Sequence, residues 1–439
     1  MINTNIIFEK NAINKNNKEH LVLIEIQGEP IKPIKQVKKT LNLSLVIDIS
    51  GSMSSGLSNF KSNIFSPTLS IDKIFENKNN IQSMSKLDLV KKAAIEALHN
   101  LSEGDFISVI AFDNNVEIIQ EATAITESNI NSITDKINSL RPRDWTNIQG
   151  GWLEGCAQVS KNYDKKYLNR VILLTDGQAN FGETNGDIIV SEVLKVYQYK
   201  ISTSCFGVGG SFNETLLNGM AESGGGNFYY IQTDSDIIDS FQEEFNGISS
   251  TLAYNTKLNF SLNKGFEVTE CLNSYKVENG SYFLPNVTKN KISILFNIKS
   301  KNLTKLSNAD FGTGTLHYND HLGLEQKITF KIISPLVSKS QFLKIEDNQE
   351  VKIQEIILRS AESKLAASLE AKSGNIEKAK NILRATHNTI SAGTSNYQDS
   401  RLFAESDSIN NTILTASDQN PDALTKSLFY QSYKTRTNK

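Results

Sequence analysis

The stretch LSLVIDISGS, residues 43–52, decides the fold of this chain. Its apolar part ends at Ile47 and is followed by Gly and Ser residues, a pattern typical of a buried parallel strand. Asp48, Ser50 and Ser52 then lie where the strand passes into a loop. In an open α/β sheet, ligands bind at that end of the strands. One carboxylate and two hydroxyls at alternating positions offer only oxygen, which suits a hard divalent cation such as Mg²⁺.

The motif Asp-x-Ser-x-Ser is weak alone, because Ser and Asp in loops often only satisfy local backbone groups. Two further segments strengthen the metal hypothesis. RVILLT, residues 170–175, is a second apolar strand and is followed directly by Asp176. Thr146 lies in DWTNIQGG, residues 144–151, in front of a predicted helix. Three segments therefore supply two carboxylates and three hydroxyls.

With these motifs, the chain resembles a von Willebrand factor type A (VWA) domain with a complete metal-ion-dependent adhesion site. The resemblance covers residues 43–245 and includes the family's Asp-Gly-x-x-Asn pattern at 176–180. It implies that one cation, Mg²⁺ or else Ca²⁺ or Mn²⁺, is surrounded by Asp48, Ser50, Ser52, Thr146 and Asp176. It implies no catalytic residue and no organic cofactor. The second loop departs from the family, because Asp144-Trp145 stands where Gly-Gly is common.

Strand and helix patterns alternate over the predicted VWA domain, residues 43–250. This order predicts an α/β fold with a doubly wound, mostly parallel, Rossmann-like sheet and helices on both faces. A polar insertion, residues 54–84, separates the first motif from an amphipathic helix that begins after Ser85. We expect this insertion to be either a surface loop or a lid or recognition rim for a partner. Gly207 and Gly209 do not complete a dinucleotide-binding motif, because residue 212 is Phe.

The flanks have different patterns. Alternating strands in residues 252–335 predict an antiparallel β-sandwich, which the strands of a β flank at residues 1–40 join because they cannot bury a core alone. Residues 345–415 predict a helical hairpin that turns at Gly374, with a further helix after it. The polar residues 416–439 predict a flexible tail. This order of parts resembles inter-alpha-trypsin inhibitor heavy chains and bacterial VWA proteins.

The composition limits which partners and which cellular compartment we expect for this chain. A formal net charge of −2 favours neither nucleic acid nor an anionic membrane as the partner. Three widely spaced cysteines, Cys156, Cys205 and Cys271, favour a reducing compartment. The first residues lack the pattern of a secretory signal, and no apolar run is long enough to span a bilayer. We therefore expect a cytoplasmic protein, with secretion left open.

Our leading functional hypothesis is a metal-dependent protein-binding module, not an enzyme, whose partner presents an Asp or Glu to the cation. One alternative is a regulatory subunit of a larger complex of the ATPase or signalling type. Another is metal-assisted hydrolysis, which needs a general base near the metal. No His accompanies the motifs, and Asp113 and Asp144 are the candidate bases.

Overall fold

The predicted doubly wound sheet is confirmed. The computed structural model describes residues 2–14, 18–29, 39–57, 84–143, 145–300, 308–320 and 323–437. Six strands have the order β6-β5-β4-β7-β8-β9, with β6 antiparallel to β5 and the other neighbours parallel. They are β4 (Leu41–Asp48), β5 (Phe106–Phe112), β6 (Val116–Ala124), β7 (Leu168–Thr175), β8 (Ile201–Val208) and β9 (Gly225–Ile231).

Helices cover both faces of this sheet, because successive side chains of a strand point to opposite sides. On β4, Leu43, Leu45 and Ile47 pack in one apolar cluster and Val46 packs in the other. The first cluster includes residues of α1 (Lys86–His99), α2 (Ile130–Ser139) and α6 (Asp234–Ser250). The second includes residues of α3 (Ile148–Lys161), α4 (Gly186–Gln198) and α5 (Glu214–Ser223). Burial on both faces explains the nearly continuous apolar runs.

The predicted insertion, residues 54–84, starts and ends at one place beside the sheet. A short 3-10 turn, η1 (Gly51–Ser54), follows β4. Gly56 then forms an antiparallel bridge with Ser85, the residue before α1. Residues 58–83, and with them the hypothetical lid or recognition rim, lie outside the described residues. The bridge brings together the described residues on either side of this segment, next to the start of α1.

A β domain flanks the sheet and consists of two sheets that share one apolar core. The four-stranded sheet contains, in order, β1 (Ile2–Phe8), β3 (Glu19–Gly28), β14 (Ile292–Ser300) and β11 (Phe266–Cys271). The other contains, in order, β12 (Val277–Glu278), β13 (Ser281–Phe283), β10 (Ala253–Leu262), β15 (Asn308–Asp320), β16 (Glu325–Val337) and β2 (Ile13–Asn14). All pairs are antiparallel except β16 with β2. The N-terminal strands therefore lie within the β domain.

The chain leaves the β domain after β3, builds the α/β domain and returns at β10. Exit and return lie side by side, since a Cβ on Gly28 would come within 2.4 Å of Leu252 Cδ1. The register places Ile24 of β3 opposite Ile294 of β14, on either side of the whole α/β domain in sequence. The β domain is thus built from two distant segments.

Helices form the C-terminal part. After the short α7 (Lys339–Phe342), the long α8 (Gln349–Lys372) and α9 (Ile376–Tyr397) make the predicted hairpin, followed by α10 (Ser400–Thr415). Gly374 between α8 and α9 has φ +79°, a backbone conformation that glycine adopts without strain. Among the described residues, no helix has both the length and the apolar content needed to cross a bilayer.

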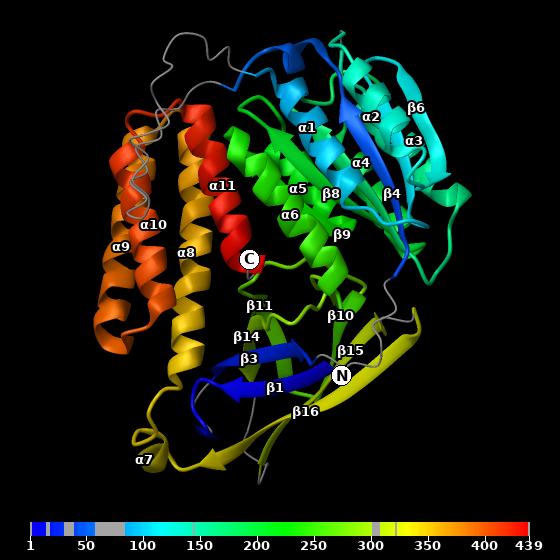
Figure 1. Cartoon of the computed structure of the whole chain (residues 1–439). Helices are drawn as coiled ribbons and strands as arrows, with labels where there is room; N and C mark the ends of the chain where they lie inside the picture. Colours follow the sequence, from blue (N-terminus) through cyan, green and yellow to red (C-terminus); the bar gives the residue numbers. More distant parts are fainter. Residues whose placement is uncertain are drawn as a thin grey trace, which may run out of the picture.

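The flexible tail predicted for residues 416–439 is wrong. Residues 421–437 form a further helix, α11 (Pro421–Thr437), which packs along α8 (Figure 1). Leu424 and Leu428 are fully buried in the core of the helical part, and Tyr433 is buried against the α/β domain. The polar residues that suggested a tail have partners, since Ser432 Oγ donates to Ala361 O at 2.7 Å. Composition therefore underestimated the order of this segment.

Candidate metal centre

The five predicted ligands meet at the carboxyl edge of the sheet. Asp48 ends β4, Ser50 and Ser52 lie at the start of η1, and Asp176 follows β7. Thr146 belongs to the loop before α3. Parallel neighbours β4 and β7 end side by side, so their following loops face one another. The topology therefore brings together residues that are far apart in sequence.

Hydrogen bonds and close approaches define the geometry of this cluster. Ser52 Oγ donates to Asp176 Oδ1 at 2.6 Å and lies 3.1 Å from Ser50 Oγ. A Cβ placed on Gly177 would lie 3.0 Å from Thr146 Oγ1 and 3.4 Å from Asp48 Oδ2. Those two oxygens therefore lie near one point, and glycine leaves the space open. The cluster combines two carboxylates and three hydroxyls, a set of donors that fits a hard divalent cation.

Exposure differs within the cluster. Asp48 and Asp176 are fully buried, and Ser50 and Thr146 are nearly so, whereas Ser52 is exposed. The charged groups therefore lie at the bottom of the site and one hydroxyl lies at its mouth. A cation at this position would contact the buried carboxylates on its inner side. A ligand from outside would reach it from the side of Ser52.

The Thr146 loop is held by the third motif. Asn180 Oδ1 accepts the Thr146 N–H at 2.8 Å, and Thr146 O accepts the N–H groups of Asn180 and Phe181, both at 3.3 Å. Asn147 then caps α3 by accepting the Gly150 N–H at 3.0 Å. These bonds fix the loop although it lacks the family's Gly-Gly. Asn180 would therefore support the candidate site by holding the backbone of Thr146 in position.

The two candidate bases for hydrolysis differ in what the structure says about them. Asp113 is buried in the turn between β5 and β6, where its Oδ1 accepts the Asn115 N–H at 2.6 Å. Its backbone oxygen accepts the Asn147 N–H at 2.8 Å. Asp113 thus has the contacts of a turn residue. Asp144 lies outside the described residues.

Burial dominates the electrostatics of Asp48. It raises the pKa of this carboxyl to about 7, against hydrogen bonds from the Thr175 hydroxyl and from Ser50 that lower it. The Thr175 hydroxyl donates to Asp48 Oδ2, and the Ser50 N–H donates to Oδ1 at 2.8 Å. The nearby charge of Asp176 raises the pKa further. Two carboxylates in a dry site therefore call for a compensating positive charge.

Lys86 supplies one such charge, and the sequence analysis did not find it. Its ammonium, on a side chain only 8% exposed, lies 2.7 Å from Asp176 Oδ2. Lys86 is the first residue of α1, directly after the cap residue Ser85. A Cβ on Gly209 would come within 2.8 Å of Lys86 Cε, so glycine there makes room for the lysine. The lysine therefore compensates part of the buried negative charge.

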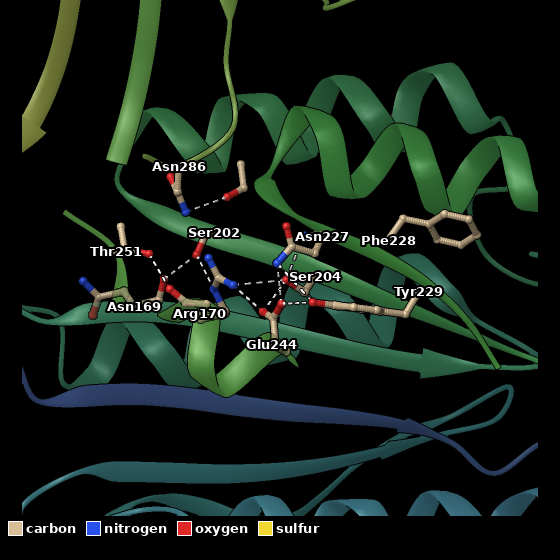
Figure 2. Close-up of polar contacts among 12 residues, drawn as sticks. Asn169, Arg170, Ser202, Ser204, Asn227, Phe228, Tyr229, Glu244, Thr251 and Asn286 are labelled. Carbon is tan, nitrogen blue, oxygen red and sulfur yellow. Dashed lines mark hydrogen bonds and ion pairs between the residues drawn. The ribbon is translucent and has the colours of Figure 1, made fainter. Parts of the chain in front are cut away.

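A second polar cluster lies at the opposite, amino edge of the sheet. Figure 2 shows the carboxylate of Glu244, on α6, surrounded by Arg170 of β7 and residues of β8 and β9. Ser204 Oγ and Asn227 Nδ2 each donate to it at 2.6 Å, and Tyr229 Oη donates at 3.1 Å. Three members of the cluster, Arg170, Asn227 and Tyr229, also line a cavity of about 640 Å³ between the α/β and β domains. The bonds within the cluster tie α6 to three strands, a structural role.

The doubly wound sheet with helices on both faces defines a class of α/β domains, and comparison with known proteins agrees with this fold. Residues 80–244 match the family model of the von Willebrand factor type A domain. Inter-alpha-trypsin inhibitor heavy chain 4 of Mus musculus is 29% identical over 199 residues, 43% of this chain and 21% of that protein. The chain spans less than half the length of the curated relatives it matches.

Solved structures are similar over nearly the whole chain. A von Willebrand factor type A protein from Catenulispora acidiphila aligns with a TM-score of 0.68 at 14% identity, covering 94% of this chain and 88% of that one. The ArnB paralog VWA2 from Sulfolobus acidocaldarius aligns with a TM-score of 0.59 at 15% identity, covering 99% and 98%. The chain therefore contains a VWA domain, a class of domain that commonly mediates protein–protein interactions.

Proposed function

We propose that this chain is a protein-binding module that holds a divalent cation, Mg²⁺ or else Ca²⁺ or Mn²⁺, and captures an acidic residue of its partner. The observation that carries this proposal is the convergence of Asp48, Ser50, Ser52, Thr146 and Asp176 at one edge of the sheet. All five provide oxygen. Among the described residues, no group of three or more His, Cys, Asp and Glu side chains forms a rival metal site.

Each residue has a distinct part in this proposal. Asp48 and Asp176 provide the negative charge, and their burial strengthens their attraction for a cation. Ser50, Ser52 and Thr146 add neutral oxygens, so that the cation keeps most of its positive charge. When bound, the cation offers an open coordination position to a carboxylate from outside. Because Ser52 is the exposed member, the partner approaches from its side.

The hydrolase alternative has less support. It needs a base close to the metal, and Asp113 is engaged in its turn. We therefore propose that the chain is not an enzyme. A regulatory subunit of a larger complex would use the same capture chemistry and differ only in the identity of the partner.

Calorimetric titration with Mg²⁺ tests the metal site. For a dissociation constant on the order of 0.1 mM, 1 mM free Mg²⁺ would stabilise the fold by about 1.4 kcal/mol. Asp48→Ala should abolish both the heat of binding and this increment. The metal-free fold should persist, because the sheet already holds the strand ends. Wild-type protein that gives no binding heat with Mg²⁺, Ca²⁺ or Mn²⁺ would refute the proposal.

Partner capture has its own test. Binding should fail with chelator, return with Mg²⁺, and weaken in Thr146→Ala, mainly through faster dissociation. Binding that survives both chelator and the Asp48→Ala, Thr146→Ala double variant would exclude metal-mediated recognition. Turnover of a phosphoester or amide that Asp48→Ala abolishes would instead favour the hydrolase.

A further inference from the structure

Two large aromatic side chains stand exposed beside the candidate metal centre. Trp145 is 60% exposed and Phe181 is 47% exposed. The second tryptophan of the chain, Trp152, is fully buried, and its indole N–H donates to Thr203 Oγ1 at 3.0 Å. Single exposed apolar residues are ordinary on protein surfaces. A pair on neighbouring loops of one candidate site calls for an explanation.

Both aromatic residues are attached to the cluster of metal ligands. Trp145 directly precedes Thr146 in the chain, and the Phe181 N–H donates to Thr146 O at 3.3 Å. Asn180 binds the N–H of the same threonine. The two loops are therefore joined at Thr146, and the backbones that carry the aromatic rings are held in place.

Among the described residues around the centre, the other exposed side chains are small or polar, except Met84 before α1, which is 39% exposed. The small or polar ones are Gly51, Ser54 and Ser55 after β4, Gln178 and Asn180 after β7, and Gly210 and Ser211 after β8. Of the apolar surface that the described residues expose here, the larger part thus lies on the side of Thr146. Each aromatic side chain can bury 150–250 Å² in a contact, so this pair still has roughly 200 Å² to offer a partner.

We propose that Trp145 and Phe181 form an aromatic rim that selects the partner. The rim recognises a protein segment that carries an apolar or aromatic side chain within about three residues of its metal-seeking Asp or Glu. The inference rests on the proposed function and gives the partner's chemistry. The position of the two rings next to the site supports the inference, because a partner carboxylate held at the cation places the neighbouring side chains of the partner against these rings. Exposed tryptophan beside a desolvated polar centre is a frequent composition of interface hot spots.

A random peptide library displayed on phage tests the rim. Phage are bound to the full chain in Mg²⁺ and eluted with chelator, so that only metal-dependent binders are recovered. From wild-type protein we expect peptides that combine an Asp or Glu with a nearby Trp, Phe, Leu, Ile or Met. From Trp145→Ala, Phe181→Ala protein we expect the acidic residue without the apolar neighbour. The best wild-type peptide should bind this double variant about tenfold more weakly, a loss of about 1.4 kcal/mol.

Matched controls separate the rim from the metal. Tyr199→Ala removes an aromatic side chain that is 73% exposed, at the end of α4 and at the opposite edge of the sheet, and should leave peptide binding unchanged. Calorimetric Mg²⁺ affinity and thermal unfolding should be the same in both variants and the wild type. Trp145→Phe should retain most of the affinity. An equal loss in Tyr199→Ala would overturn the assignment.

The outcomes distinguish the two proposals. Acidic peptides without apolar neighbours, or an apolar preference that persists in the double variant, would overturn the rim and leave metal-dependent capture standing. Absence of acidic peptides in the chelator eluate would overturn capture and the rim together. A chelator-sensitive dimer of the chain that is lost in the double variant would mean that the rim binds a second copy of the chain. It would overturn the proposal that the partner is a different protein.

Discussion

Lys86 gives the metal-free site half of the positive charge that its two carboxylates require. Its ammonium lies 2.7 Å from Asp176, and both side chains are almost fully buried. A buried ion pair of this kind stabilises little against an apolar substitute, but removing one partner leaves a charge without compensation. If the site binds a divalent cation as proposed, that cation and Lys86 would compete for the negative charge of Asp176.

We predict that Lys86→Met destabilises the metal-free chain by about 3 kcal/mol and tightens Mg²⁺ binding several-fold. The destabilisation follows because two buried carboxylates then have no cation, and the tighter binding follows because Mg²⁺ provides one. Urea unfolding in chelator and in Mg²⁺, with calorimetric titration, measures both effects. Lys92→Met, on an exposed position of the same helix, should change stability by less than about 0.5 kcal/mol.

Equal Mg²⁺ affinity in Lys86→Met and wild type would contradict the competition.

The sequence predicted that the five oxygen donors share one edge, and the structure places them there. It did not predict Lys86 or Thr175. Each lies next to a recognised residue, Ser85 or Asp176, but only the packing of α1 against the edge of the sheet shows where the lysine points. A lysine directly after a helix cap at this edge is the signal that could have revealed it.

At the scale of elements, Glu350 joins α8 to α10 through a bidentate salt bridge with Arg401. The two guanidinium nitrogens donate to the two carboxylate oxygens at 2.8 and 2.7 Å. Hydrogen bonds from Arg401 lower the pKa of Glu350 from an ordinary 4.5 to about 2, against desolvation. Because the pKa is lower in the folded chain, the stabilisation is complete above pH 4.5 and is lost as pH falls toward 2.

We predict that the stability difference between wild type and Glu350→Gln shrinks as pH falls from 6 to 3.5. The contribution is about 1 kcal/mol or less, since both side chains are partly exposed and screened by solvent. Urea unfolding at pH 6, 4.5 and 3.5 measures it. Arg401→Met should remove this pH-dependent part together with that of Asp399, whose pKa Arg401 also lowers. A difference that stays constant over this range would argue against a lowered pKa in the folded chain.

The α8–α9 hairpin was predictable, and α11 was not. The hairpin was expected because two long segments that favour helix flank Gly374, and in α9 the apolar residues repeat at helical spacing. In α11, Thr425, Lys426 and Ser432 are buried along with the apolar residues, so its sequence has little contrast between faces. Tertiary partners compensate for this, as Lys426 pairs with Glu214 of α5 at 3.3 Å. A helix that depends on distant partners cannot be recognised from local pattern.

At the scale of the whole molecule, the helical part docks on the α/β domain as well as on the β domain. Leu21 and Leu23 of β3 pack against Val351 and Leu358 of α8. At the α/β domain, the Phe228 N–H of β9 donates to Tyr433 Oη of α11 at 3.1 Å. Lys372, at the end of α8, pairs with Glu214 at 2.8 Å. The three parts therefore have a shared interior rather than a loose linkage.

We predict that Tyr433→Ala lowers the free energy of unfolding by about 3 kcal/mol and separates one unfolding transition into two. The variant removes a fully packed ring at the junction and leaves the Phe228 N–H without its acceptor. Phe403→Ala, on α10, removes a ring that is 46% exposed and should have little effect. Denaturation followed by fluorescence and by circular dichroism measures this. Coincident, unshifted transitions in Tyr433→Ala would mean that α11 does not couple the parts.

The adjacency of Gly28 and Leu252 has a consequence for synthesis on the ribosome. Strand β3 emerges early, but its partner β14 emerges only after the complete α/β domain. If that domain folds first, it holds the two junctions together. Strands β3 and β14 then pair by closing a short loop, whereas in an unfolded chain they would have to close a loop of more than half of the chain. Each halving of a loop saves about 0.6 kcal/mol of closure entropy, so the nascent VWA domain acts as the template on which the β domain assembles.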